Sequence, residues 1–147
     1  MKVQDILNQK GSTVYSITPD ATVYDAVSKM SKLEVGALLV MEGDSLVGII
    51  SERDYRDKVI LKGRTSRDTK VIEIMTKDLI TVTPDDKVKL CMQHMTDKKI
   101  RHLPVLEGNK VAGVISIGDM VKAIIDSQKN EIESMREYIS SGGNYPS

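Results

Sequence analysis

The sequence predicts an α+β fold made of two tandem repeats, each with the element order strand, helix, hairpin and helix. The chain has 147 residues, 40% of them hydrophobic, which is enough for one sizeable core. A shift of 65 residues superimposes Thr18–Asp54 on Thr83–Asp119 without a gap. Both copies also show the same order of strand-like and helix-like hydrophobic patterns, which is the signature of an internal repeat.

The duplication extends upstream of this stretch. Val3–Leu7 matches Val71–Met75 at a shift of 68 residues, so the first copy carries three extra residues around positions 8–13. The segment Lys62–Lys70 is rich in Gly, Thr, Ser and charge and is predicted to be a solvated linker. The expected boundaries are therefore 1–61 for the first repeat, 62–70 for the linker, 71–126 for the second repeat and 127–147 for a C-terminal extension.

Each copy begins with a short strand and an amphipathic helix. Val14–Thr18 and Leu79–Thr83 are apolar or β-branched and end at a Thr-Pro-Asp turn. Apolar residues then recur at the i, i+3, i+4, i+7 spacing of a helix with one buried face: Val23, Ala26, Val27 and Met30 in the first copy, and Val88, Cys91, Met92 and Met95 in the second. Thr22, with Asp25 three residues later, is the predicted N-cap of the first helix.

A hairpin and a second helix complete each copy. Two apolar runs joined by Gly-Asp or Gly-Asn predict the hairpins, which span Ala37–Met41 with Leu46–Ile50 and Leu103–Leu106 with Val111–Ile115. The closing helices begin at Ser51 and Ser116.

The second closing helix is expected to continue as a heptad seam, formed by Val121, Ile125, Gln128, Ile132, Met135 and Ile139. This stripe is expected to meet a second chain or to fold back on its own body, and the tail 140–147 is expected to be disordered.

Composition excludes several classes of protein. The 21 basic and 21 acidic residues give zero net charge, so nucleic acid is not an expected partner. The longest apolar run, Ala37–Met41, is far too short to span a membrane. A single cysteine, Cys91, and no signal peptide predict a reducing, cytoplasmic location. Because the common phosphate-loop, dinucleotide and metalloprotease motifs are missing, no enzyme is expected.

The doubled pattern Gly-apolar-apolar-Ser-x-x-Asp, each copy after a Glu-Gly hairpin, resembles the CBS (cystathionine-β-synthase) domain family. The segments that carry the resemblance are Thr18–Val23, Gly48–Asp54, Ile100–Val105 and Gly113–Asp119. It implies that the two copies pair through their sheets into one Bateman module with pseudo-two-fold symmetry. Such modules regulate rather than catalyse, and they commonly bind AMP, ADP or ATP, and sometimes S-adenosylmethionine or a dinucleotide such as NAD.

The resemblance also implies two clefts, each built from both copies. The first combines Val35, Gly36 and Ala37 with Val114, Ser116 and Asp119, and the second combines Ile100, Arg101 and His102 with Ile49, Ser51 and Asp54. The aspartates are implied to accept from ribose hydroxyls, the serines to lie near the ribose or α-phosphate, and Ile49 and Val114 to pack on adenine.

Basic residues distinguish the two copies. Arg101 and His102 match a family position that often contacts phosphate, and Arg53 lies at a helix N-terminus where an anion can bind. The first copy has no such basic residues at Gly36 and Ala37, so the two clefts are expected to differ.

Structural roles for the same residues remain open. Ser-x-x-Asp is also a helix capping box, and a duplicated fold duplicates its caps. Arg101 and His102 could be surface residues at a strand edge. Cys91 is expected to be a small core residue, His94 to face solvent, and no metal site is expected.

The predicted function is therefore a non-catalytic regulatory module. It would bind an adenine nucleotide or related adenosyl ligand, form a homodimer and signal occupancy to a partner such as an enzyme or a transporter. One alternative is a constitutive dimerisation scaffold whose clefts are filled by side chains. Another is a small thiol- or metal-dependent enzyme that uses Cys91, His94 and His102.

Overall fold

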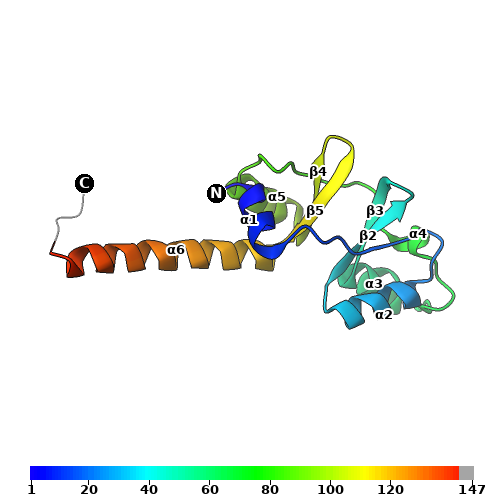
Figure 1. Cartoon of the computed structure of the whole chain (residues 1–147). Helices are drawn as coiled ribbons and strands as arrows, with labels where there is room; N and C mark the ends of the chain where they lie inside the picture. Colours follow the sequence, from blue (N-terminus) through cyan, green and yellow to red (C-terminus); the bar gives the residue numbers. More distant parts are fainter. Residues whose placement is uncertain (143–147) are drawn as a thin grey trace.

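The computed structural model describes residues 1–142 and confirms the α+β fold of two repeats. Two hairpins stand next to each other in the middle of the molecule, each with its own helices, and one long helix projects from the body (Figure 1). That helix, α6 (Ile117–Ser140), includes the residue at which a disordered tail was expected to begin. The prediction for 143–147 lies outside the described residues.

The first half contains a three-stranded sheet and two helices. Its elements are β1 (Ser16–Ile17), α2 (Val23–Leu33), β2 (Ala37–Glu42), β3 (Ser45–Ser51) and α3 (Glu52–Lys58). β1 pairs in parallel with β2, and β2 pairs antiparallel with β3. The predicted N-cap is present, because the Thr22 hydroxyl accepts from the backbone N–H of Asp25 at 3.1 Å.

The second half repeats this arrangement with one difference. Its elements are α5 (Val88–Lys98), β4 (His102–Glu107), β5 (Lys110–Ser116) and the start of α6. The strand predicted over Leu79–Thr83 is only a single bridge between Val82 and Val105. The reason is Pro104: its carbonyl accepts from Val82 N–H at 3.0 Å, but it has no N–H to continue the ladder. Leu39, at the matching position of the first half, donates to Tyr15 O at 3.2 Å, and β1 forms there.

Two short helices that the element prediction did not include are exchanged between the halves. α1 (Val3–Lys10) packs into the core of the second half, and α4 (Val71–Ile74), which follows the 3-10 turn η1 (Ile60–Lys62) and the linker, packs into the core of the first. Equivalent backbone bonds hold both helices: Val3 N–H donates to Asp86 O and Val71 N–H donates to Ala21 O, each at 2.9 Å. The structural halves therefore depart from the sequence boundaries at these two helices.

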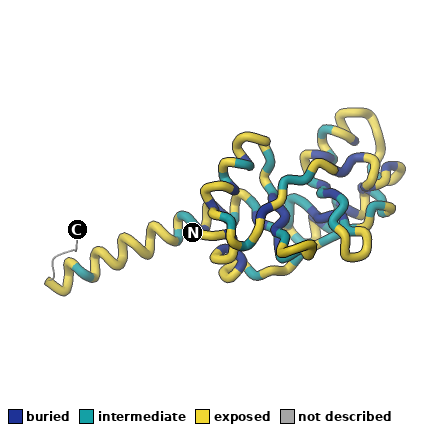
Figure 2. The backbone as a smooth tube through the Cα atoms, turned by 90° about the horizontal axis from the view of Figure 1, so that it is seen from above, coloured by how far each residue is buried: buried dark blue, intermediate teal, exposed yellow. Residues whose placement is uncertain are grey.

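The core is aliphatic, as expected for a chain without Phe or Trp, and burial is concentrated in the body while most of the projecting part of α6 is exposed (Figure 2). Cys91 is fully buried in the core of the second half. Burial raises the pKa of its thiol to about 11, the opposite of what a nucleophilic cysteine requires. Among the helices of residues 1–142, none combines the length and the apolar character needed to cross a membrane.

Candidate functional site

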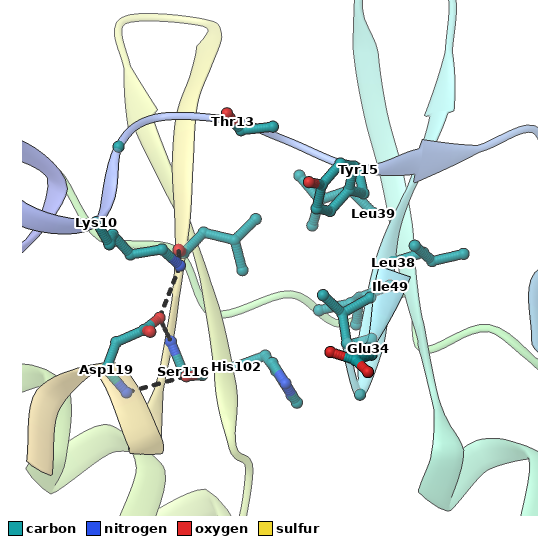
Figure 3. A pocket seen from close by; sticks show the side chains of 15 residues that line it. Lys10, Thr13, Tyr15, Glu34, Leu38, Leu39, Ile49, His102, Ser116 and Asp119 are labelled. Atoms are coloured by element: carbon teal, nitrogen blue, oxygen red, sulfur yellow. Dashed lines mark hydrogen bonds and ion pairs between the residues drawn. The ribbon is translucent and has the colours of Figure 1, made fainter. Parts of the chain in front are cut away.

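A cavity of about 410 Å³ lies between the two hairpins (Figure 3). This volume falls in the range of small-molecule sites. One wall comes from β2, β3 and the residues before β2, and the other from β4, β5 and the first turn of α6. The chain after α1 crosses from one side to the other. The lining residues are Lys10, Gly11, Thr13, Tyr15, Glu34, Val35, Gly36, Ala37, Leu38, Leu39, Ile49, His102, Val114, Ser116 and Asp119.

The structure brings the first predicted cleft together in this cavity. All six of its residues are lining residues: Val35, Gly36, Ala37, Val114, Ser116 and Asp119. Ile49 and His102, which the resemblance implied for the second cleft, line the same cavity.

The remaining predicted site residues lie outside this cavity: Ile100, Arg101, Ser51, Arg53 and Asp54. Arg53 instead donates from Nη1 to the backbone oxygen of Lys99 at 2.5 Å, which joins α3 to the end of α5. Arg101 is exposed, and its backbone oxygen accepts from Ile117 N–H at 2.9 Å at the start of α6.

Asp119 is the ionised acceptor of the cavity. Its Oδ2 accepts from the backbone N–H of Ser116 at 2.8 Å and from Lys10 Nζ at 2.7 Å. Burial alone would raise the pKa of Asp119, but the hydrogen bonds from Lys10 and Ser116 outweigh it and hold the pKa below its usual value. Among residues 1–142 no hydrogen bond reaches Oδ1, so this carboxylate keeps capacity to accept.

Asp54 has the same motif but different surroundings. It forms the same capping box, with Ser51 N–H donating to Oδ2 at 3.0 Å. Its Oδ1 pairs with Lys58 Nζ at 2.9 Å and accepts from the Thr76 hydroxyl at 3.3 Å. Asp54 is only 7% exposed. Both of its oxygens are therefore engaged by the chain itself.

The two Ser-x-x-Asp motifs differ because the C-terminal ends of the two exchanged helices differ. After α4, Thr76 pairs with the backbone of β3 at Ile49, with N···O distances of 2.8 and 3.0 Å, and closes over Asp54. The first copy's extra residues lengthen the helix instead: α1 has eight residues and α4 has four, and among residues 1–15 no backbone pairing matches that of Thr76. Lys10 instead reaches Asp119 and donates to the backbone oxygen of Val114 at 2.7 Å. The longer helix therefore places a lysine side chain beside Asp119 and Val114, where the first half has a paired backbone segment.

His102 extends from the first residue of β4 toward the other half. A Cβ on Gly36 would lie 3.5 Å from its Cε1, an ordinary van der Waals distance, so the ring lies next to this residue of the first half. Burial lowers the pKa of His102 more than the charge of Asp119 raises it, and the ring is therefore neutral at pH 7. The charged side chains along the cavity are Lys10, Glu34 and Asp119.

Sequence reasoning missed several lining residues, of which Lys10, Tyr15 and Glu34 carry chemistry. The signal for Lys10 was the insertion of three residues around positions 8–13 of the first copy, since extra residues at a site change what lines it. Tyr15 is one of only five tyrosines, which are the sole aromatic residues of the chain. No group of three or more His, Cys, Asp or Glu within 1–142 is arranged to hold a metal ion.

Comparison with known proteins agrees with this architecture. The CBS domain family matches residues 3–60 and 71–126. The CBS domain-containing protein CBSX3, mitochondrial, of Arabidopsis thaliana is 44% identical over 95% of this chain and 72% of its own length. The structure of a protein with CBS domains from Burkholderia ambifaria superimposes with a TM-score of 0.85 at 46% identity, covering 87% of this chain and 96% of that one. A hexameric CBS-CP12 protein from bloom-forming cyanobacteria has a TM-score of 0.72 at 28% identity, covering 97% and 88%.

Two repeats that exchange their first helices and enclose a cavity between their hairpins define a paired-repeat module. The matches place this chain in the CBS domain family. The resemblance predicted from sequence is confirmed. Proteins of this family are generally regulatory modules that bind adenosyl ligands.

Proposed function

We propose that this protein is a non-catalytic regulatory module that binds one adenosyl ligand in the cavity between its hairpins. AMP, ADP and ATP are the first candidates, and S-adenosylmethionine and NAD follow. Occupancy would then alter the shape of the module and be read by a partner protein, such as a regulated enzyme or transporter.

The observation that carries the proposal is that the cavity combines an ionised carboxylate, Asp119, with apolar walls. An ionised carboxylate accepts well from two vicinal hydroxyls, as a ribose presents them. Ile49 and Val114 line the cavity from the two halves and offer apolar surface to a purine. Tyr15, also on the cavity and 39% exposed, adds an aromatic ring.

The charges of the cavity bear on which adenosyl ligand fits. Glu34 and Asp119 are acidic, Lys10 is basic and His102 is neutral at pH 7. This balance favours ligands with few phosphates over ATP, because every added phosphate brings further negative charge into a cavity lined by two carboxylates and one ammonium group. Among the adenine nucleotides, AMP is therefore expected to bind more tightly than ATP.

Calorimetry and thermal shift with adenosine, AMP, ADP, ATP, NAD and S-adenosylmethionine test the proposal. We expect at least one of these to bind, and Asp119→Ala to abolish or strongly weaken that binding. Asp54→Asn is the matched control, because Asp54 has the same motif but lies outside the cavity, and its variant should bind normally. A chain that no adenosyl compound stabilises would support the constitutive scaffold instead.

We further propose that the protein is a homodimer held in part by α6. Five large apolar residues of the predicted seam are exposed on the single chain, from 37% to 65%: Val121, Ile125, Ile132, Met135 and Ile139. Burying each stabilises by about 1.5 to 3 kcal/mol, which favours association. The hexameric cyanobacterial relative supports oligomerisation within the family in general.

The proposed location is the cytoplasm, a reducing compartment that suits the free, buried thiol of Cys91. The plant relative is named mitochondrial, so cell fractionation should examine both compartments where the host cell has them.

A further inference from the structure

The two halves use different donors for the same pair of acceptors. In the first half these acceptors are the backbone oxygen of Ile49 and the carboxylate of Asp54, and in the second half they are the backbone oxygen of Val114 and the carboxylate of Asp119. Thr76 reaches both acceptors in the first half: its N–H donates to Ile49 O at 2.8 Å and its hydroxyl donates to Asp54 Oδ1 at 3.3 Å, where Lys58 Nζ also pairs at 2.9 Å.

In the second half a single ammonium group replaces both donors of Thr76. Lys10 Nζ lies 2.7 Å from Val114 O and 2.7 Å from Asp119 Oδ2, as Figure 3 shows for the carboxylate. Thr76 is fixed by its own backbone pairing, but Lys10 holds these acceptors only with the end of a flexible side chain. That side chain is 34% exposed, so the ammonium can return to water at little cost.

We propose that Lys10 competes with the ligand for the Asp119 carboxylate. Its ammonium group holds Asp119 Oδ2 in the free protein, and the hydroxyls of the ligand must displace it. The inference rests on the proposed function and assigns a specificity-determining role to Lys10. One hydroxyl can use the unoccupied Oδ1 while Lys10 stays in place. A vicinal diol needs both oxygens and therefore competes with Lys10.

Because of this competition, Lys10 lowers the affinity of the site for its ligand. Ligands that offer two adjacent hydroxyls gain a bidentate contact only after Lys10 leaves, and the displaced ammonium is then released into the cavity. One of the two Asp119 oxygens is accordingly already engaged by Lys10 in the free protein, and the affinity of the site for a neutral nucleoside is lower than the cavity alone would give.

Lys10→Met tests the inference, since it keeps an unbranched side chain only one atom shorter and removes the donor. We expect calorimetry to show adenosine binding about three- to tenfold more tightly than to the wild type, the effect of losing one ion pair and one hydrogen bond. The gain for 2′-deoxyadenosine, which lacks the diol, should be smaller. Lys89→Met, at an exposed position of α5 away from the cavity, should change neither affinity.

A ligand-free measurement separates the outcomes. NMR titration of Asp119 should show its pKa rising in Lys10→Met, because the donor that lowers it is gone. An unchanged Asp119 pKa overturns the inference, as does adenosine binding that is unchanged or weaker in Lys10→Met while the wild type binds it. If neither form binds any adenosyl compound, the proposed function is wrong, and the proposed competition between Lys10 and the ligand is wrong as well.

Discussion

Leu7 of α1 lies so close to Gly113 of β5 that a Cβ on the glycine would stand 2.7 Å from Leu7 Cδ2. The equivalent contact in the first half joins Met75 to Gly48, where a Cβ would stand 2.6 Å from the methionine sulfur. A larger residue at either glycine would therefore force a side chain of the exchanged helix to shift where it meets the hairpin of the other half. In the second half this contact also fixes the helix whose last residue is Lys10.

Gly113→Ala should lower the free energy of unfolding by about 1 to 3 kcal/mol, because the new methyl group overpacks against the buried Leu7. Urea denaturation measures this. The matched control is Gly118→Ala in the first turn of α6, where the nearest atom to a new Cβ is Ser116 Oγ at 3.7 Å. That variant should be as stable as the wild type or more so, since alanine favours the helix. Equal stability of Gly113→Ala and Gly118→Ala would contradict the proposed contact.

Asp54→Ala should cost more stability than Asp119→Ala, although both remove the acid of a capping box. Asp54 is buried, and its loss leaves the donors of Ser51 and Thr76 without an acceptor, which costs about 1 to 3 kcal/mol. Asp119 has a partly exposed partner in Lys10, so its loss should cost about 0.5 to 1 kcal/mol. Urea denaturation of the two variants side by side compares their losses of stability. A larger loss for Asp119→Ala would contradict the description of Asp54 as buried with both oxygens engaged.

Repetition and local chemistry made much of the fold predictable from sequence. The hairpins and the caps at Thr22, Ser51 and Ser116 follow from short-range patterns, and the structure has them all. The exchange of α1 and α4 does not follow from such patterns. Apolar residues such as Val3 and Ile6 indicate burial, but not which of two similar cores receives them.

The candidate site shows the same division between local and long-range information. The residues of the first cleft could be predicted from the alignment of the two copies, because a repeat places equivalent residues at equivalent points. The motif itself could not tell Asp54 from Asp119, since their difference arises from Thr76 and Lys10, which are distant in sequence. The three extra residues of the first copy, which make α1 longer than α4, were the only local trace of this difference.

His102 should make the stability of the protein depend on pH in mildly acidic solution. Burial lowers its pKa in the folded state, whereas Asp119 raises it and Lys10 and Arg101 lower it to a lesser degree. As the pH falls below the ordinary histidine value of about 6.5, the unfolded chain takes up the proton first. The free energy of unfolding therefore falls between that value and the lower folded pKa, and this group contributes no pH dependence above it.

Urea denaturation at about pH 7.5 and pH 5.5 tests this, because the two values lie on either side of the ordinary histidine pKa. His102→Gln should lose less stability between them than the wild type. His94→Gln is the control and should keep the wild-type loss, since His102 is still present. Equal losses in the wild type and His102→Gln would assign the pH dependence to other groups.

The charges beside the α6 seam predict how two chains would pair. In the heptad pattern Ile125, Ile132 and Ile139 take position a, and Val121, Gln128 and Met135 take position d. The e positions then hold Lys122, Lys129 and Arg136, and Glu131 lies at g. A parallel pair brings Glu131 of one chain to Arg136 of the other, whereas an antiparallel pair sets the basic e residues against one another.

We therefore expect a parallel dimer through α6, and light scattering on the full chain at tens of micromolar should show two chains. Ile132→Glu should dissociate it, because the charge would enter the apolar seam. Glu131→Arg should weaken the dimer, and Glu131→Arg combined with Arg136→Glu should restore it, since the opposite charges face each other again. Met135→Cys gives an independent reading, because only parallel helices place this residue opposite itself and allow a disulfide across the seam. A monomeric wild type would exclude the dimer, and a dimer that Ile132→Glu and Glu131→Arg leave intact would move the interface away from α6.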